Sequence, residues 1–244
     1  MQGLITAAGL GTRSGLNGRL RKEMLPVYSL ESGNLVLRPI IETIYNRMRL
    51  SGIDSVGVVL DPDDSRTIEY VRSFMPDAEI IFQKSKNGYG GAVLSAVDFI
   101  SDDLFLLNAG DGMLLPPDSY ARLGVPSSRD PVISVMKVDN PRRYGNASFE
   151  PHGNELVVTG LVEKPAIPIS SYGMCAAYIL PRTIFSHFDP ELENIELTPA
   201  IGRIVSGGTV VKAVEFSRNE WISVGVAAEY VKILQRSLDA TINQ

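Results

Sequence analysis

The stretch that decides the fold is Leu4-Ile5-Thr6-Ala7-Ala8-Gly9-Leu10-Gly11-Thr12-Arg13, close to the start of the sequence. Its apolar first part, Leu4 to Ala8, is typical of a buried strand. The glycines that follow allow the backbone to approach a ligand closely and to point N–H groups at it, which suits phosphate groups. The stretch therefore predicts a strand that runs straight into a phosphate-binding loop.

Two common glycine motifs do not match this loop. The dinucleotide fingerprint requires a third glycine where the sequence has Ser14, which argues against a Rossmann-type oxidoreductase. The P-loop motif requires Gly-Lys followed by Ser or Thr, and the sequence has no such triplet. Four cations lie within ten residues instead, and they indicate either a triphosphate clamp or a solvated basic loop: Arg13, Arg19, Arg21 and Lys22.

Outward from this loop, the first half of the chain alternates short apolar runs with helical periodicity. Further buried strands are predicted over 56–60, 79–82 and 104–108. Helices are predicted to open at Pro39 and Pro62 and to span 91–100. Their expected buried faces carry Ile40, Ile44 and Met48, then Ile68, Val71 and Met75, then Val93, Val97 and Ile100. This alternation predicts an α/β, Rossmann-like fold with a mostly parallel mixed sheet and helices on both faces.

After Asp111 the pattern favours strands that pair antiparallel, in a smaller lobe. The predicted strands are 132–138, 146–149, 156–162, 174–180 and 210–216. A helix is predicted over about 198–205, and an amphipathic helix with Tyr230, Leu234 and Leu238 closes the chain. Because no linker separates the two halves, we expect a single domain over 1–244, with halves of about 1–112 and 113–244.

The composition narrows the class of protein. The chain has 244 residues, 44% of them hydrophobic, and 23 basic against 28 acidic residues give a net charge of −5. This charge does not favour a nucleic-acid partner. No apolar run approaches the roughly 18 residues of a membrane span. The single cysteine, Cys175, excludes an internal disulfide and fits a reducing compartment, so we expect a cytoplasmic protein.

Two ordered motifs carry a family resemblance. The segment Ala7-Ala8-Gly9-Leu10-Gly11-Thr12-Arg13 and the segment Lys22-Glu23-Met24-Leu25-Pro26-Val27 resemble the signature of the bacterial glucose-1-phosphate uridylyltransferases and of the wider sugar-1-phosphate nucleotidyltransferase family. The resemblance implies transfer of a nucleotidyl group from a nucleoside triphosphate, UTP or dTTP, to a sugar-1-phosphate such as glucose-1-phosphate, with release of pyrophosphate. It also implies that Arg13 contacts the β- and γ-phosphates and Lys22 the phosphates at the reacting centre. The residues that would wrap the nucleotide phosphates are Ala8, Gly9, Gly11 and Thr12.

The resemblance extends to further segments. Gln83 and the turn at Gly88 are similar to the family's base-reading segment, and an amide can read a pyrimidine edge. Asp111, flanked by glycines after a strand, would hold Mg²⁺. The segment that contains Glu196 is equally explained by a helix that Thr198 caps. The residues implied at the sugar phosphate are Gly145, Glu163, Lys164 and Glu196.

The sequence departs from the family pattern at Ser223. In Trp221-Ile222-Ser223-Val224-Gly225 the family usually has an acid, the second metal ligand, where this chain has the serine. Three outcomes are open: Asp111 and the phosphates hold Mg²⁺ with help from Ser223, another acid such as Glu220 moves in, or the protein keeps only nucleotide or sugar binding.

The mechanism implied is an in-line displacement in which cations overcome the repulsion between two anionic substrates, with Arg13, Lys22 and Lys164 as those cations. The rival is a non-catalytic nucleotide or sugar-phosphate sensor of the same fold. The short chain leads us to expect no appended acetyltransferase domain. The sugar, the base and the oligomeric state, including a homo-oligomer, stay open.

Overall fold

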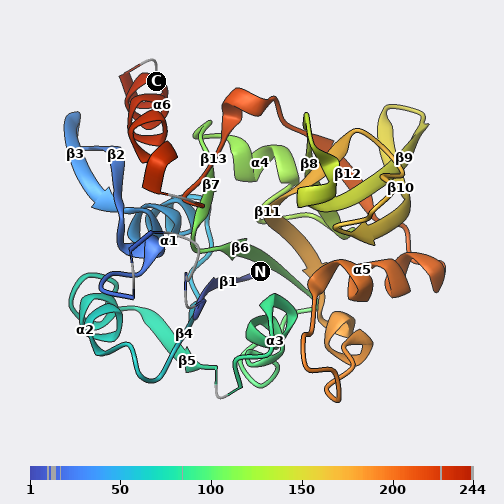
Figure 1. Ribbon diagram of the computed structural model, residues 1–244, viewed down its shortest axis with the longest axis horizontal. Coiled ribbons are helices and arrows are strands. Elements are labelled where there is room, and N and C mark those ends of the chain that lie inside the picture. Colours follow the sequence, from blue (N-terminus) through green and yellow to red (C-terminus); the bar gives the residue numbers. More distant parts are fainter. Residues whose placement is uncertain (10, 12–14, 17, 84, 226, 243–244) are drawn as a thin grey trace.

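A nine-stranded sheet forms the centre of the computed structural model, which describes residues 1–9, 11, 15–16, 18–83, 85–225 and 227–242 (Figure 1). The strand order is β5-β4-β1-β6-β11-β8-β12-β10-β9. The first four of these strands run parallel. Their bounds are Ala78–Phe82 (β5), Val56–Leu60 (β4), Gln2–Ala7 (β1) and Leu104–Ala109 (β6). Their carboxyl ends therefore lie along one edge of the sheet, where ligands of open α/β sheets bind.

The second half of the chain extends the same sheet. The strand β11 (Tyr172–Pro181) runs antiparallel to both β6 and β8. The other strands of this half are β8 (Val132–Lys137), β9 (Gly145–His152), β10 (Glu155–Glu163) and β12 (Lys212–Glu215). Most of the pairs in this half are antiparallel, but β12 runs parallel to β8. The predicted mixed α/β fold is confirmed, and the antiparallel part continues the first sheet.

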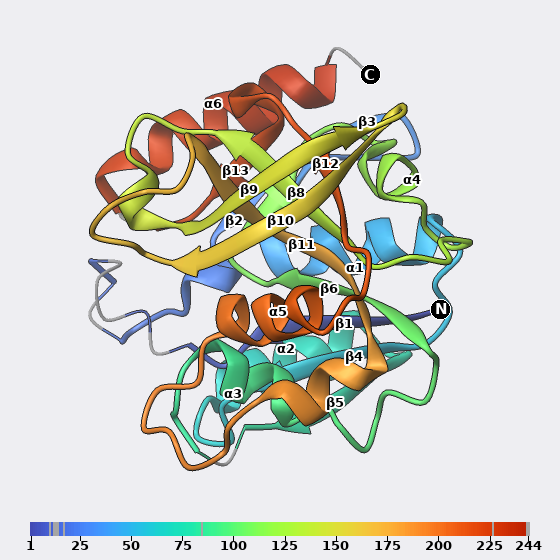
Figure 2. The same ribbon diagram turned by 90° about the vertical axis from the view of Figure 1, so that its right-hand side faces the viewer.

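Alternate residues of the central strands face two hydrophobic cores. Ile5 of β1 lies in the core beneath α1 (Ile40–Leu50) and α2 (Ser65–Phe74), whereas Leu4 faces the core beneath α3 (Tyr89–Leu94) and α5 (Leu197–Ser206). The helices therefore cover both faces, as Figures 1 and 2 show. The continuous apolar run Leu4 to Ala8 predicted a buried strand, and β1 is buried on both faces.

Two of the predicted helices differ in extent. The helix α2 begins at Ser65 rather than at Pro62, because the Asp64 side chain accepts from the Thr67 N–H and caps it. The helix α3 starts earlier than predicted and ends at Leu94, followed by turns. Val97, predicted to be buried, is 37% exposed, because it lies beyond the helix where the 3.6-residue period no longer applies. By contrast, Ile40, Ile44 and Met48 of α1 are fully buried as predicted.

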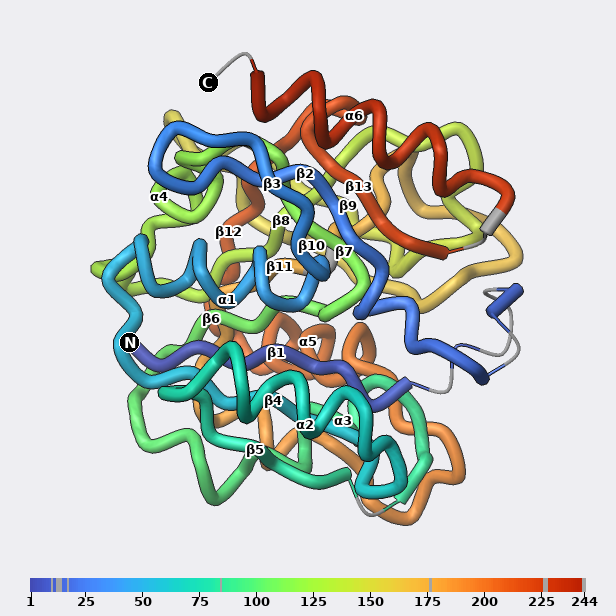
Figure 3. Tube along the Cα trace, turned by 90° about the vertical axis from the view of Figure 1, so that its left-hand side faces the viewer, coloured from blue at the N-terminus to red at the C-terminus, as the bar shows by residue number. Residues whose placement is uncertain are grey.

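Two small sheets were not predicted. A hairpin joins β2 (Pro26–Glu31) to β3 (Asn34–Pro39), and β7 (Gly112–Leu114) pairs with β13 (Trp221–Ser223). The helix α6 (Tyr230–Ile242) packs on β2 (Figure 3). Its fully buried line is Ile233, Ser237 and Thr241, while the predicted Tyr230, Leu234 and Leu238 are only partly buried. The remaining elements are α4 (Ser119–Leu123) and short 3-10 helices over Lys22–Met24, Pro141–Arg143, Arg182–His187, Arg218–Glu220 and Ala227–Glu229.

Candidate active site

The carboxyl ends of the four parallel strands bring the nucleotide-side residues to one edge. The glycine loop follows β1, Gln83 follows β5, and Asp111 lies in the turn after β6. The Gly110 N–H donates to the Thr6 carbonyl at 2.8 Å, which holds the Asp111 turn against the start of the glycine loop. Residues about a hundred positions apart in sequence are thus neighbours because β1 and β6 are adjacent strands.

An ion pair lies at the centre of this edge. The Lys22 ammonium contacts the Asp111 carboxylate, and each side chain is 22% exposed. Lys22 opens a 3-10 helix in which the Met24 N–H donates to the Arg21 carbonyl and the Leu25 N–H to the Lys22 carbonyl, so the turn that leads into β2 sets its position. The structure therefore brings together the two predicted catalytic side chains that it describes.

Beneath this pair lies an acid that sequence reasoning did not single out. Glu23 is only 2% exposed, and its Oε2 has no hydrogen-bond partner among the described residues. Burial raises the pKa of Glu23 to about 8, the Lys22 charge opposes that rise, and the Asp111 charge adds to it. Because Glu23 follows Lys22 directly, the sequence alone does not distinguish it from a surface acid, and its burial depends on tertiary contacts.

Ser223 lies beside Asp111 through the register of a two-stranded sheet. Ser223 of β13 pairs with Gly112 of β7, and the Val224 N–H donates to the Asp111 carbonyl at 2.7 Å. Gly112 has to be a glycine, since a Cβ there would lie 2.3 Å from the Trp221 ring. The predicted second metal position therefore adjoins the first.

Another acid does not take over from Ser223. Glu220 lies at the far end of β13, where its carboxylate contacts Arg122 and accepts from the Ser217 N–H at 2.7 Å. Although burial alone would raise the pKa of Glu220, its hydrogen bonds from Ser217 and Arg122 lower it. Because both of its oxygens are engaged, Glu220 is held away from Asp111.

The donors at Asp111 suit Mg²⁺ only in part. A hard cation prefers oxygen ligands, and it accepts one or two carboxylates together with substrate phosphates. Asp111 supplies one carboxylate and Ser223 a neutral hydroxyl. Among the described residues, no cluster of three or more acids, histidines or cysteines forms a metal cage. The residues present therefore fit a magnesium ion whose remaining ligands are phosphates and water.

Gln83 and Gly88 lie in one compact loop. The Gln83 side chain is 5% exposed and donates to the Ser85 carbonyl at 2.8 Å. Gly88 has φ +96°, and a Cβ there would lie 2.3 Å from Asn194. Gly88 is therefore a glycine for both backbone and steric reasons.

The residues predicted around the sugar phosphate also converge. Gly145 pairs with Glu163 across β9 and β10. The Lys164 Nζ lies 2.5 Å from Glu163 Oε1 and 3.7 Å from Glu196 Oε1. Thr198, which the sequence offered as a helix cap, donates to Glu163 Oε2 at 2.5 Å instead and makes no capping hydrogen bond. A Cβ at Gly145 would lie 2.5 Å from the Thr198 hydroxyl.

The strand β11 connects this second cluster to Asp111. Tyr178 of β11 pairs with Leu107 of β6, and the strand runs on to Met174, whose sulfur lies 3.9 Å from the Thr198 hydroxyl. Burial raises the pKa of Tyr178, and the negative charges of Glu163 and Asp111 both add to that rise. The buried Tyr178 phenol is thus near enough to both acids for each of them to raise its pKa.

The predicted cation clamp is only partly described. Thr12 and Arg13 lie outside the described residues. Arg19 is exposed, and Arg21 pairs with Asp61 at 2.7 Å, so its charge is directed into the protein. Among the described residues of the predicted clamp, Lys22 is the cation that contacts Asp111.

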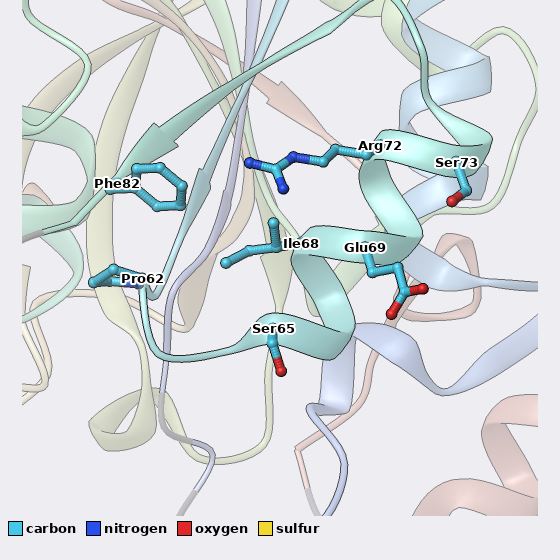
Figure 4. Close-up of a pocket in the computed structure, with 7 residues that line it drawn as sticks. All are labelled: Pro62, Ser65, Ile68, Glu69, Arg72, Ser73 and Phe82. Atoms are coloured by element: carbon cyan, nitrogen blue, oxygen red, sulfur yellow. The ribbon is translucent and has the colours of Figure 1, made fainter.

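Two other features lie apart from this site. Cys175 is fully buried, and burial raises the pKa of its thiol to about 12, in agreement with a core residue rather than a nucleophile. A surface pocket of about 540 Å³ lies between α2 and the end of β5, where Arg72 and Phe82 face Ile68 (Figure 4). It contains none of the predicted site residues. In the described part of the chain, no helix has the length and apolar character of a membrane span.

A family model described as nucleotidyl transferase matches residues 2–240. The chain belongs to this family. The bifunctional protein GlmU of Methanococcus maripaludis strain C5 is 29% identical over 215 residues, which cover 85% of this chain and 48% of that protein. This nucleotidyl transferase chain spans about half the length of the curated relatives it matches.

Two solved structures share the fold of this family member. A candidate glucose-1-phosphate thymidylyltransferase of Bacillus anthracis in complex with a sucrose is 20% identical, with a TM-score of 0.80 over 98% of this chain and 96% of that one. A UDP-glucose pyrophosphorylase complexed with UDP-glucose is 18% identical, with a TM-score of 0.76 over 100% of this chain and 99% of that one. At these identities the likeness concerns the fold.

Proposed function

We propose that this chain transfers a nucleotidyl group from a nucleoside triphosphate to a sugar-1-phosphate and releases pyrophosphate. The observation that carries the proposal is the presence of two lysine–acid clusters, Lys22 with Asp111 after β6 and Lys164 with Glu163 at the end of β10. UTP or dTTP and glucose-1-phosphate are the proposed substrates, supported by the names of the relatives and by the motif resemblance.

Each cluster offers a cation to one anionic substrate. In the proposed reaction a phosphate oxygen of the sugar-1-phosphate attacks the α-phosphorus, and the bond to the pyrophosphate leaving group breaks. Lys22 would neutralise the triphosphate at the reacting centre, and Lys164 the phosphate of the sugar. Because each ammonium is paired with a carboxylate in the structure, an incoming phosphate would replace that carboxylate as its partner.

The freed acids have roles of their own. Glu163 and Glu196 can accept hydrogen bonds from sugar hydroxyls once Lys164 turns to the phosphate. Asp111, with Ser223 beside it, would hold Mg²⁺. That ion would supply further neutralisation of phosphate charge. Holding both substrates in line can itself contribute several kcal/mol to the rate.

A second candidate function is nucleotide or sugar-phosphate binding without turnover. Ser223 favours it, because loss of a metal-site partner can cost roughly 10–100-fold in affinity or activity. The retained Lys22–Asp111 pair supports the catalytic proposal instead.

Pyrophosphate release separates the two functions. The protein is incubated with Mg²⁺, glucose-1-phosphate and UTP, dTTP, CTP or GTP in turn. We expect turnover with one pyrimidine triphosphate, and a fall of about 100-fold or more in Lys22→Ala and Asp111→Asn, the size of losing one preorganised electrostatic contact. Lys137→Ala, at an exposed lysine of β8, is the matched control. Tight binding without release in the wild type would instead establish the binding protein, and unchanged rates in both variants would reject the proposed site.

A further inference from the structure

Asp61 follows β4, the strand that lies between β1 and β5 in the sheet. The glycine loop leaves the carboxyl end of β1, and the loop of Gln83 to Gly88 leaves that of β5. Because all three strands are parallel, the end of β4 lies between the two loops. A side chain at Asp61 is therefore within reach of both.

Asp61 receives one cation from each neighbouring loop. Its Oδ2 lies 2.7 Å from Arg21 Nη2 and 3.1 Å from Lys86 Nζ. Arg21 in turn donates from Nη1 to the Gly9 carbonyl at 3.0 Å and from Nε to Asp64 at 3.2 Å. One carboxylate thus joins the glycine loop, through Arg21, to the base-side loop, through Lys86.

The Asp61 and Arg21 part of this network is largely buried, whereas Lys86 is 45% exposed. The Asp61 side chain is 1% exposed, and its other oxygen accepts from the Asp63 N–H at 3.1 Å. Burial alone would raise the pKa of Asp61, but the hydrogen bonds from Asp63, Lys86 and Arg21 lower it. Breaking a buried, hydrogen-bonded ion pair leaves an uncompensated charge, so such contacts hold their geometry more firmly than exposed pairs do.

We propose that Asp61 is a positioning residue. It fixes the glycine loop after β1 and the loop of Gln83 to Gly88 after β5 relative to each other, so that the phosphate end and the base end of a nucleoside triphosphate are held at the same time. The inference rests on the proposed function. Asp61 acts through Arg21 and Lys86 and need not contact the nucleotide.

The consequence is that binding of the triphosphate part and binding of the nucleoside part of one nucleotide depend on each other. When a ligand has two linked parts, the second part binds with an effective concentration that depends on how well the two subsites are spaced. If the ion pairs of Asp61 are removed, each loop keeps its own contacts with its part of the nucleotide. The distance between the two loops is then no longer fixed at the length of the nucleotide. The intact nucleotide should then lose affinity, while its separate parts should not.

The experiment measures the affinities of UTP, tripolyphosphate and uridine for the full chain by calorimetry and ligand-observed NMR. The test variants are Asp61→Asn and Lys86→Met. Lys86 is 45% exposed, so the second variant cuts one tie without disturbing the core. Glu69→Gln is the matched control, because it removes one acid from the exposed face of α2, outside this network.

We expect UTP to bind about tenfold more weakly to both test variants, with uridine within about threefold of wild type. Tripolyphosphate should bind Asp61→Asn as well as or better than wild type, since Arg21 then loses its nearest acid. The control should match wild type for all three ligands.

Two results would overturn the positioning role. One is UTP affinity in both test variants within twofold of wild type, and the other is a proportional loss for UTP and for its parts, which would indicate local damage. Wild-type protein that binds none of UTP, dTTP, CTP or GTP would refute the proposed function itself, and the inference with it.

Discussion

Ser223 is a neutral residue at the end of β13, where the family resemblance implies an acid. Its backbone is held beside Asp111 by the Val224 hydrogen bond, so a carboxylate at this position would adjoin the first one. Asp111 therefore faces the Lys22 ammonium without a second acid from β13.

Ser223→Asp should strengthen magnesium binding. A hard cation favours a second carboxylate over a neutral hydroxyl, so the apparent Mg²⁺ affinity is expected to rise by about tenfold or more. A magnesium titration of pyrophosphate release and direct Mn²⁺ binding by electron paramagnetic resonance would check it. Ser223→Ala is the control: a fall in affinity there shows that the hydroxyl itself contributes. An unchanged Mn²⁺ affinity in Ser223→Asp would exclude this position from the metal site.

Glu23 makes stability depend on pH in an unusual direction. Its pKa in the folded protein is about 8, well above the usual 4.5, so the folded state holds a proton that the unfolded state releases. The contribution to stability is full below about pH 4.5 and is lost as the pH rises through about 8.

Glu23→Gln should remove this dependence. The free energy of unfolding of the variant, relative to wild type, is expected to rise from pH 5 to pH 8 by at most about 1.4 kcal/mol per pH unit. Urea unfolding at a series of pH values measures it, and Glu69→Gln on the exposed face of α2 serves as the control. Parallel pH profiles for wild type and Glu23→Gln would show that the carboxyl is ionised in the folded protein.

Among the elements, α6 protects a strand edge with its own side chains. The Ser237 hydroxyl accepts from the Tyr28 N–H at 3.1 Å, and Thr241 donates to the Tyr28 carbonyl at 3.3 Å. Hydroxyl groups thus replace the missing neighbour strand of β2. This explains why the buried line of α6 carries polar residues, which a search for apolar periodicity passes over.

Ser237→Ala should destabilise the protein without changing its chemistry. It leaves the Tyr28 N–H without its partner, at an expected cost of about 1–2 kcal/mol in the free energy of unfolding. Urea denaturation is the measurement, with Ser73→Ala on the exposed side of α2 as the control. Stability equal to that of the control would mean that water replaces the hydroxyl at this edge.

At the scale of the whole molecule, one sheet spans both halves of the chain. The pairing of β11 with β6 joins them in the middle of the sheet, and Trp221 of the second half packs on Gly112 of β7. We therefore propose that the halves fold as one cooperative unit.

Urea unfolding should show one transition. The chain has a single tryptophan, so Trp221 fluorescence reports the junction and far-ultraviolet circular dichroism reports the whole backbone. Coincident curves are expected for a cooperative two-state transition. Midpoints that differ between the two probes would mean that the halves unfold separately.

Local pattern was sufficient for the four parallel strands of the main sheet and for α1. The run Val56–Leu60 is β4 as predicted, and Ile40, Ile44 and Met48 are buried as their spacing indicated. Local pattern failed where another element decides the outcome. The start of α3, where the Gly90 N–H donates to the Ile195 carbonyl at 2.7 Å, and the polar buried face of α6 both depend on neighbours distant in sequence.

The sequence by itself determined the class of fold and the residue types at the site, because strand periodicity, glycine turns and the order of the motifs are properties of short segments. Tertiary structure alone decided which charges meet. Lys22 lies against Asp111, Arg21 turns inward to Asp61, and Glu23 is buried beneath them. Three charged residues adjacent in sequence thus differ in burial and in ion-pair partner, because strand order and packing set both properties of a charged side chain.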